Sequence, residues 1–164
     1  MSVPRPASTA ALLQVDAIVQ KLPGTAAVAE VCRFLEASFR HYSWVGVYRL
    51  DGRELVLQAY AGPQATEHER IPVERGLCGR AARDGVTVIV DDVRSSPEYL
   101  ACFLSTRSEI VVPIRDRGTV VGEIDIDGNE VKAYDASDRK FLETVAGKLG
   151  PAVRAAAGEP PRPA

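Results

Sequence analysis

The sequence predicts an α+β fold in which helices from both ends of the chain pack on one face of an antiparallel sheet. Apolar residues recur at helical spacing near both ends of the chain. Between them, two pairs of β-rich segments are joined by tight-turn sequences, as in β-hairpins. Helices with one apolar face can bury it against one side of such a sheet. A chain of 164 residues is long enough to bury this core as one domain.

Two helices are expected before the first strand. The first runs from Thr9 to Lys21 and stops at Pro23-Gly24. Thr25 is expected to cap the second helix. The buried stripe of that helix follows the spacing i, i+3, i+4, i+7, i+11 and comprises Val28, Val31, Cys32, Leu35 and Phe39.

The first predicted hairpin joins residues 44–50 to residues 55–61. Asp51-Gly52 lies between them and is a strong turn signal. Val86–Val90 is a further short run of β-branched residues. The irregular region 62–108 is the place to look for a site, because loops over a sheet carry much of the function of such folds.

The second predicted hairpin joins residues 109–114 to residues 119–127 around Arg117-Gly118. A last helix is expected to open at Asp135 or Ser137. Its apolar face consists of Phe141, Leu142, Val145 and Leu149.

Composition limits the classes of protein that the chain can represent. Residues 1–8 and the proline-rich residues 158–164 are expected to be disordered, the latter without a packing partner, so that the domain spans residues 9–157. The net charge of −2 and pI of about 5.7 give no basic footprint for nucleic acid. No apolar run can span a membrane and no secretory signal is present, so the protein is expected in the cytoplasm. Its three cysteines are then thiols at rest.

The three cysteines differ in their surroundings. Cys32 lies on the buried stripe and is interpreted as a core thiol. Cys78 lies in Arg75-Gly76-Leu77-Cys78-Gly79-Arg80 at an expected helix start, where the helix dipole and two arginines favour the thiolate. Cys102, by contrast, fits a buried thiol as well as a reactive one. A zinc site from Cys78, Cys102 and His68 is disfavoured because no close ligand pair exists, and no metal is predicted.

Acidic and aromatic residues mark two strand faces. In Gly122-Glu123-Ile124-Asp125-Ile126-Asp127-Gly128 the three acids share one face, which is either a solvated sheet face or a cluster around a cation. Glu109 begins the partner strand and can approach these acids, although the register is not readable. Trp44, Gly46 and Tyr48 share a face, where two rings beside a glycine form either a ligand slot or ordinary core.

Together these segments resemble the free methionine-(R)-sulfoxide reductases, which are single GAF domains. The resemblance covers residues 10–155 in the family's order. The matching stretches are Trp44-Val45-Gly46-Val47-Tyr48, Arg70-Ile71-Pro72 with Gly76-Leu77-Cys78-Gly79, Leu100-Ala101-Cys102, Ser108-Glu109-Ile110-Val111-Val112-Pro113 and Gly122-Glu123-Ile124-Asp125-Ile126-Asp127. It implies a GAF-like antiparallel sheet with the terminal helices on one face and loops and short helices enclosing a pocket on the other.

The resemblance also implies residue roles. Cys102 is the nucleophile on sulfur and Cys78 resolves the resulting sulfenic acid. Glu109, Asp125 and Asp127 hold the amino group and the sulfoxide oxygen, while Trp44 and Tyr48 wall the methyl end of the substrate. Glu109 is also the candidate acid for the leaving oxygen, since clustered carboxyl groups keep one of their number protonated. The local electrostatics instead make Cys78 the better thiolate, so the choice of nucleophile follows the family.

Two departures from the family concern the step that returns the oxidised cysteine to the thiol. His68 stands where many members carry a third cysteine, and Phe103 stands where an acid is common. Cys78 then resolves alone, or an external thiol does so. The expected reductant is an external thioredoxin-like dithiol, and the protein itself is expected to bind no cofactor. The preference for the R epimer is implied by the resemblance alone. A homodimer is one expected oligomeric state.

Two other function classes stay open from the sequence. One is a non-catalytic GAF sensor for a small molecule, which the lack of an attached output domain speaks against. The other is a redox switch in which Cys78 and Cys102 form a regulatory disulfide. Release of methionine from free methionine sulfoxide separates the enzyme from both.

Overall fold

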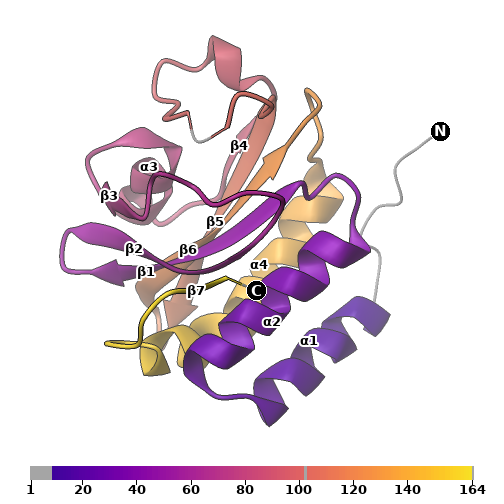
Figure 1. The fold of residues 1–164 in the computed structure, drawn as a ribbon, viewed down its shortest axis with the longest axis vertical. Coiled ribbons are helices and arrows are strands. Elements are labelled where there is room, and N and C mark those ends of the chain that lie inside the picture. Colours follow the sequence, from indigo (N-terminus) through magenta and orange to yellow (C-terminus); the bar gives the residue numbers. More distant parts are fainter. Residues whose placement is uncertain (1–8, 102, 164) are drawn as a thin grey trace.

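The computed structural model describes residues 9–101 and 103–163 and shows one sheet, antiparallel except for β7, between two layers (Figure 1). The strand order is β3-β2-β1-β6-β5-β4, and β7 also pairs with β2. The helices are α1 (Thr9–Lys21), α2 (Gly24–Ser38), α3 (Gly76–Asp84), the 3-10 helix η1 (Val93–Ser95) and α4 (Ala136–Ala155). The strands are β1 (Trp44–Asp51), β2 (Glu54–Ala61), β3 (Arg70–Pro72), β4 (Val88–Val90), β5 (Ser108–Asp116), β6 (Thr119–Gly128) and β7 (Arg162–Pro163).

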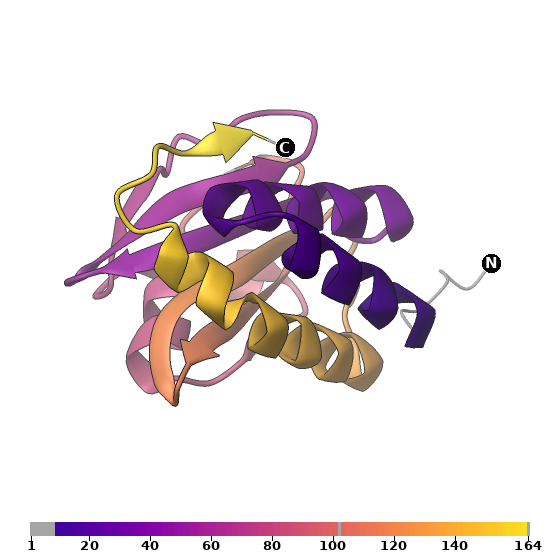
Figure 2. The same cartoon turned by 90° about the horizontal axis from the view of Figure 1, so that it is seen from below.

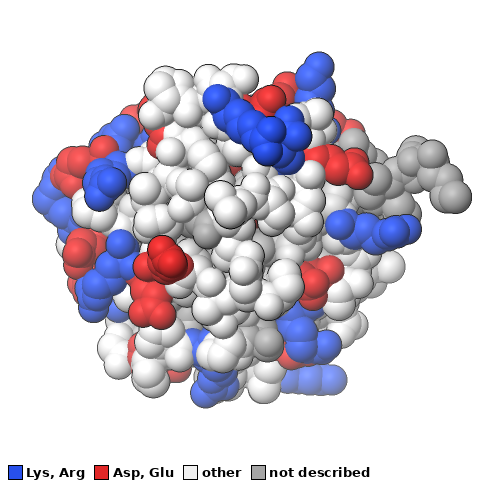
Figure 3. Space-filling model, turned by 45° about the horizontal axis from the view of Figure 1, so that its top comes forward, with Lys and Arg blue, Asp and Glu red and all other residues white. Residues whose placement is uncertain are grey.

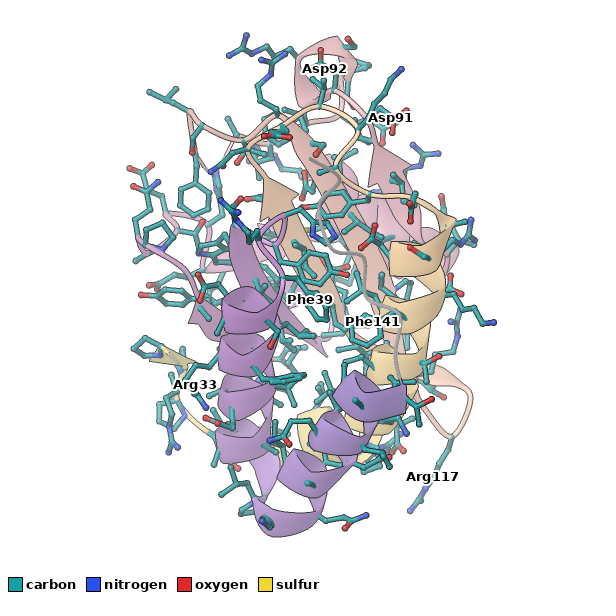
Figure 4. All side chains as sticks on the ribbon, turned by 90° about the vertical axis from the view of Figure 1, so that its right-hand side faces the viewer. Arg33, Phe39, Asp91, Asp92, Arg117 and Phe141 are labelled. Carbon is teal, nitrogen blue, oxygen red and sulfur yellow. The ribbon has the colours of Figure 1, made fainter. Side chains whose placement is uncertain are left out.

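Helices α2 and α4 cover one face of the sheet and α1 packs against both of them, as Figure 2 shows from below. The predicted packing of the two ends of the chain is therefore confirmed. Between these helices and the sheet lies the larger core, to which β6 contributes Ile124 and Ile126. Phe39 and Phe141 meet edge to face with ring centroids 5.4 Å apart, and both point inward between α2 and α4 (Figure 4). Such aromatic contacts add specificity to the area that the helices bury.

Both predicted hairpins are present. Asp51 pairs with Glu54 across the first turn, and Asp116 pairs with Thr119 across the second. In the second turn Arg117 and Gly118 both have positive φ, of 52° and 81°, which is the geometry of a tight hairpin turn. The hairpins fix the register of β1, β5 and β6 and so determine which side chains share a face.

One predicted helix cap is wrong. Thr25 lies inside α2, whose N-cap is Pro23, without a side-chain hydrogen bond. The Thr25 hydroxyl instead accepts a hydrogen bond from Gln58 on β2 (2.7 Å). The last helix does follow its sequence signal, since Asp135 caps α4 in a capping box with Asp138.

The proline-rich tail has packing partners, contrary to expectation. Within it, Arg162 and Pro163 pair in parallel with Ala59 and Tyr60 of β2. The Glu159 carboxylate accepts a hydrogen bond from the Thr25 backbone N–H (3.3 Å). The expected disorder of residues 1–8 concerns a segment outside the described residues.

The other face of the sheet carries α3, η1 and the long loops between β2 and β5 (Figure 1). A second apolar cluster fills the space beneath them and includes Trp44, Tyr48 and Cys78. On the face shown in Figure 3, acidic and basic side chains are intermingled around an uncharged centre. Among the described residues, no helix combines the length and the apolar character needed to cross a bilayer.

Candidate functional site

The register of three strands places the acidic residues in a row under α3. On β6, Glu123, Asp125 and Asp127 alternate with Ile124 and Ile126, which enter the opposite core. Asp127 lies directly opposite Glu109 of β5, and Asp125 lies opposite Gly46 of β1. The prediction that the three acids share one face, with Glu109 near them, is therefore confirmed.

This row of carboxyl groups is buried, so the alternative of a solvated sheet face is wrong. The exposed fractions are 0% for Glu123, 1% for Asp125, 3% for Asp127 and 6% for Glu109. Among the described residues, both carboxyl oxygens of Glu123, Oδ1 of Asp125 and Oδ2 of Asp127 have no hydrogen-bond partner. Buried polar atoms without partners are uncommon in folded proteins and point to a ligand.

Burial also changes the protonation of these acids. It raises the pKa of Asp125, and it raises the pKa of Glu123 and Asp127 well above the ordinary range. The charge of Asp125 raises the pKa of Glu123 and of Asp127 further. A carboxyl group in this setting keeps a proton because its charged form loses hydration and faces like charge.

Cys78 lies in the first turn of α3 and points at the carboxyl groups. Its Sγ atom and one carboxyl oxygen each from Glu109 and Asp125 lie within 4.8 Å of one another. Burial raises the pKa of the Cys78 thiol well above its ordinary value, and the charges of Asp125, Glu123 and Glu109 raise it further. The thiol is therefore held protonated.

The predicted thiolate character of Cys78 is wrong for this reason. The predicted helix start is confirmed, since α3 begins at Gly76, which has a φ of 71°. Arg75 and Arg80, however, are exposed, and Arg80 pairs with Glu98 at 3.6 Å. Solvent-exposed charges act weakly on a buried group compared with the carboxyl groups beside it.

Cys102 lies outside the described residues, but its chain neighbours reach the site. Leu100 lines a small cavity together with Cys78, Glu109 and Asp125. Phe103 lines a second cavity together with Trp44 and Asp127. Of the predicted site residues, Cys78, Glu109 and Asp125 line the first cavity, and Trp44 and Asp127 line the second. Glu109 of the first cavity faces Asp127 of the second across the strands.

The two predicted aromatic residues are buried on β1. The ring of Trp44 covers Gly46, where any Cβ atom would overlap it, and stacks on Tyr60 with centroids 5.8 Å apart. Trp44 itself therefore fills the space above Gly46, and it also lines the cavity that Asp127 borders. The Tyr48 hydroxyl donates a hydrogen bond to the backbone carbonyl of His68 (2.8 Å).

Cys32 is a core thiol, as predicted. It is fully buried between α2 and the sheet, and its Sγ lies 3.9 Å from the carbonyl oxygen of Ala59. Burial raises its pKa to about 12. This thiol takes no part in the site on the other face of the sheet.

Two residues near the site were not assigned to it from the sequence. Glu123 borders Cys78 and is the most deeply buried of the four acids. The alternation of residues 122–128 already placed it on the acidic face, but burial beneath α3 was not visible in that pattern. The other is His68, whose Nε2 lies 3.0 Å from the carbonyl oxygen of Ala101, next to Cys102 in the chain.

The known proteins that this chain resembles are GAF-domain proteins, among them free methionine-R-sulfoxide reductases. A family model described as "GAF domain" matches residues 24–154. The free methionine-R-sulfoxide reductase of Escherichia coli is 30% identical over 76% of this chain and 74% of its own. The structure of a type II free methionine-R-sulfoxide reductase from Thermoplasma acidophilum is 40% identical, with a TM-score of 0.75 over 77% of this chain and 89% of that one. The Neisseria meningitidis reductase, solved with its substrate, is 34% identical, with a TM-score of 0.81 over 95% and 97%.

Proposed function

The chain belongs to the GAF-domain family and, within it, to the free methionine-R-sulfoxide reductases, and on this premise we propose that it reduces free L-methionine (R)-sulfoxide to methionine. The observation that supports this most is the meeting of the Cys78 thiol with buried carboxyl groups in one enclosed space. A thiol can take part in reducing a sulfoxide, and carboxyl groups can both supply protons and bind an ammonium group.

In the proposed reaction the Cys102 sulfur attacks the sulfoxide sulfur. The attack forms a bond between the two sulfur atoms. The oxygen then passes to the Cys102 sulfur while the sulfur–sulfur bond and the sulfur–oxygen bond of the substrate break, so that methionine leaves and Cys102 becomes a sulfenic acid. Glu109 is the candidate acid that protonates this oxygen as it leaves sulfur. The sulfoxide gains two electrons and the cysteine sulfur loses two, so the step balances without a metal or an organic cofactor.

Support for Cys102 as the nucleophile comes from the state of Cys78. A thiol attacks as its thiolate, and burial, together with the neighbouring carboxyl groups, raises the pKa of Cys78 and disfavours that form. We assign Cys78 the second step, in which the Cys78 thiol gives its proton to the oxygen of the sulfenic acid, its sulfur bonds to the Cys102 sulfur to form a disulfide, and the oxygen departs as water. A thioredoxin-like dithiol of the cytoplasm then reduces this disulfide by exchange.

Asp125 and Asp127 are proposed to select the free amino acid. No basic side chain among the described residues forms an ion pair with either, so no internal cation competes for them. The substrate ammonium would favour their ionised form and satisfy oxygens that otherwise lack partners. Trp44 and Tyr48 would enclose the methyl end. A peptide-bound methionine sulfoxide has no ammonium group and should be rejected.

The test is methionine release from free methionine (R)-sulfoxide with dithiothreitol as reductant. We expect release with the R epimer, and little with the S epimer or with N-acetylmethionine sulfoxide. In single-turnover assays without reductant, Cys78→Ser should release one equivalent and Cys102→Ser none. The matched control is Cys32→Ala, whose thiol lies in the opposite core and should leave release unchanged. Absence of release with either epimer would reject the proposal in favour of a sensor or a redox switch.

A further inference from the structure

We propose that Cys78, Glu109 and Asp125 also form a binding site for a thiophilic divalent cation, for which Zn²⁺ is the probe. We further propose that this cation competes with the substrate for the same carboxyl groups. The first statement stands on the geometry of the site alone, and the second rests on the proposed function.

The spacing of the three groups suits such an ion. Their ligand atoms lie within 4.8 Å of one another and come from α3, β5 and β6, so that one ion can reach all three. In tetrahedral zinc sites, Zn–S bonds of ~2.3 Å and Zn–O bonds of ~2.0 Å bring sulfur and oxygen ligands to about 3.5 Å from each other. Shifts of about 1 Å, within reach of side-chain rotation, would complete this geometry.

Unpartnered oxygens supply the second reason. Asp125 is 99% buried, and its Oδ1 has no hydrogen-bond partner among the described residues. Glu123 has no exposed surface and borders Cys78, so a further carboxyl group adjoins the three proposed ligands. Buried carboxyl oxygens without partners are costly, and a divalent cation can satisfy several of them at once. Thiol and carboxyl groups bind a metal in their deprotonated forms, so binding of the cation would be coupled to release of their protons.

The size of the cavity and the donor set indicate the class of cation. The cavity between these groups has a volume of about 10 Å³. This is room for one water-sized particle, and therefore for a single ion. Mg²⁺ and Ca²⁺ require six or more oxygen ligands, whereas a thiolate with two carboxylates suits Zn²⁺. The site should therefore prefer Zn²⁺ over Mg²⁺.

The binding test is calorimetric titration of the full chain with Zn²⁺, with a phosphine reductant in place of dithiothreitol, which chelates zinc. Cys78→Ser and Asp125→Asn should each weaken Zn²⁺ binding by at least about tenfold, the lower end of the loss seen even for outer-shell partners. The Asn variant keeps the side-chain shape and removes a buried carboxyl group, so it should remain folded. Cys32→Ala is the matched thiol control and should bind as the unaltered chain does. An equal affinity for Mg²⁺, or unchanged Zn²⁺ binding in both variants, would overturn the site.

The competition test uses the reductase assay with the same phosphine reductant. Zn²⁺ should raise the KM for free methionine sulfoxide and leave kcat at saturating substrate unchanged. A fall in kcat with no change in KM would refute the competition. The two proposals can fail separately: Zn²⁺ binding that depends on Cys78 and Asp125, in a chain that releases no methionine, would keep the cation site and reject the reductase. Zn²⁺ binding lost in Cys102→Ser but kept in Cys78→Ser would refute the assigned ligands.

Discussion

The imidazole Nε2 of His68 lies 3.0 Å from the carbonyl oxygen of Ala101, the residue directly before Cys102 in the chain. The His68 carbonyl in turn accepts the hydrogen bond of the Tyr48 hydroxyl. The residue that stands where many family members carry a third cysteine thus connects an aromatic residue of the site to the segment that carries the proposed nucleophile.

His68→Ala should therefore slow methionine release while leaving the fold intact. Loss of one hydrogen bond of about 1 kcal/mol corresponds to a roughly fivefold lower kcat if the bond orients the nucleophile's segment. His68→Gln, whose amide N–H can donate to the same carbonyl, should recover most of the rate. The measurement is kcat and KM for both variants, alongside thermal unfolding. Equal rates in the unaltered, Ala and Gln chains would show that the contact has no part in catalysis.

Glu123→Leu should make the protein more stable at neutral pH. Burial raises the pKa of Glu123 well above 4.5, so the folded state binds a proton that the unfolded state has released. The bound proton contributes to the free energy of unfolding. This contribution is complete below the pKa that Glu123 has in the unfolded chain, and it is lost as the pH rises through the pKa of Glu123 in the folded chain. Replacing the carboxyl group by an apolar group of similar size removes a buried polar cost of about 1–3 kcal/mol.

The measurement is urea unfolding of both chains between pH 5 and pH 8, where the stability of the Leu variant should depend less on pH. Glu143 provides a control, because its pKa is shifted in the opposite direction to that of Glu123. Although partial burial raises its pKa, hydrogen bonds from Thr87 and Arg139 lower it overall. Glu143→Gln should therefore lose a little stability above the ordinary pKa of the carboxyl group. A Glu123→Leu variant that is less stable at pH 8 than the unaltered chain would refute the assignment of a buried, protonated acid.

The described thiols should be slow to react in the folded protein. Cys32 and Cys78 are buried and their pKa values are raised, so iodoacetamide at pH 8 should leave both unmodified for far longer than in urea. Under the proposed function, Cys102 is the first residue to be labelled. Peptide mapping by mass spectrometry after timed labelling measures the order. Labelling of Cys78 before Cys102 would reverse the proposed roles.

Gly46→Ala should destabilise the protein by about 1–3 kcal/mol, the usual cost of overpacking. Its added Cβ would overlap the ring of Trp44, which must then move from its stack on Tyr60. Gly147→Ala on α4 is the matched control, because no atom lies within 4 Å of its added Cβ. That variant should gain about 1 kcal/mol from helix propensity. Thermal unfolding measures both, and tryptophan fluorescence reports the displacement of Trp44.

Local signals were sufficient to predict most of the elements. Turn sequences at Asp51-Gly52 and Arg117-Gly118 fixed both hairpins, and Asp135 fixed the start of α4. These signals act over a few residues and can be read without knowing the fold. Thr25 shows the limit: its hydroxyl is a good cap in isolation, but a distant glutamine uses it instead.

The chemistry of the site depended on burial, which the sequence does not state. A helix start flanked by arginines favours a thiolate only when solvent does not screen the arginines and no carboxyl group is closer. For Cys78 both conditions fail, because Arg75 and Arg80 are exposed and three acids adjoin the sulfur. The alternation of Glu123 with its neighbours predicted the face, but only the packing of α3 over that face determined the protonation of its acids.

Pairing of the C-terminal residues with β2 has a consequence for how copies of this chain meet. β2 is the second strand of the sheet, and its outer side is shared by β3 along residues 54–56 and by β7 along residues 59–60. A strand side left bare is a template for pairing with another chain, and aggregation often starts there. A chain cut at residue 158 would uncover the backbone of Ala59 and Tyr60, and we expect such a chain to pair with other copies through β2 more readily than the full chain does.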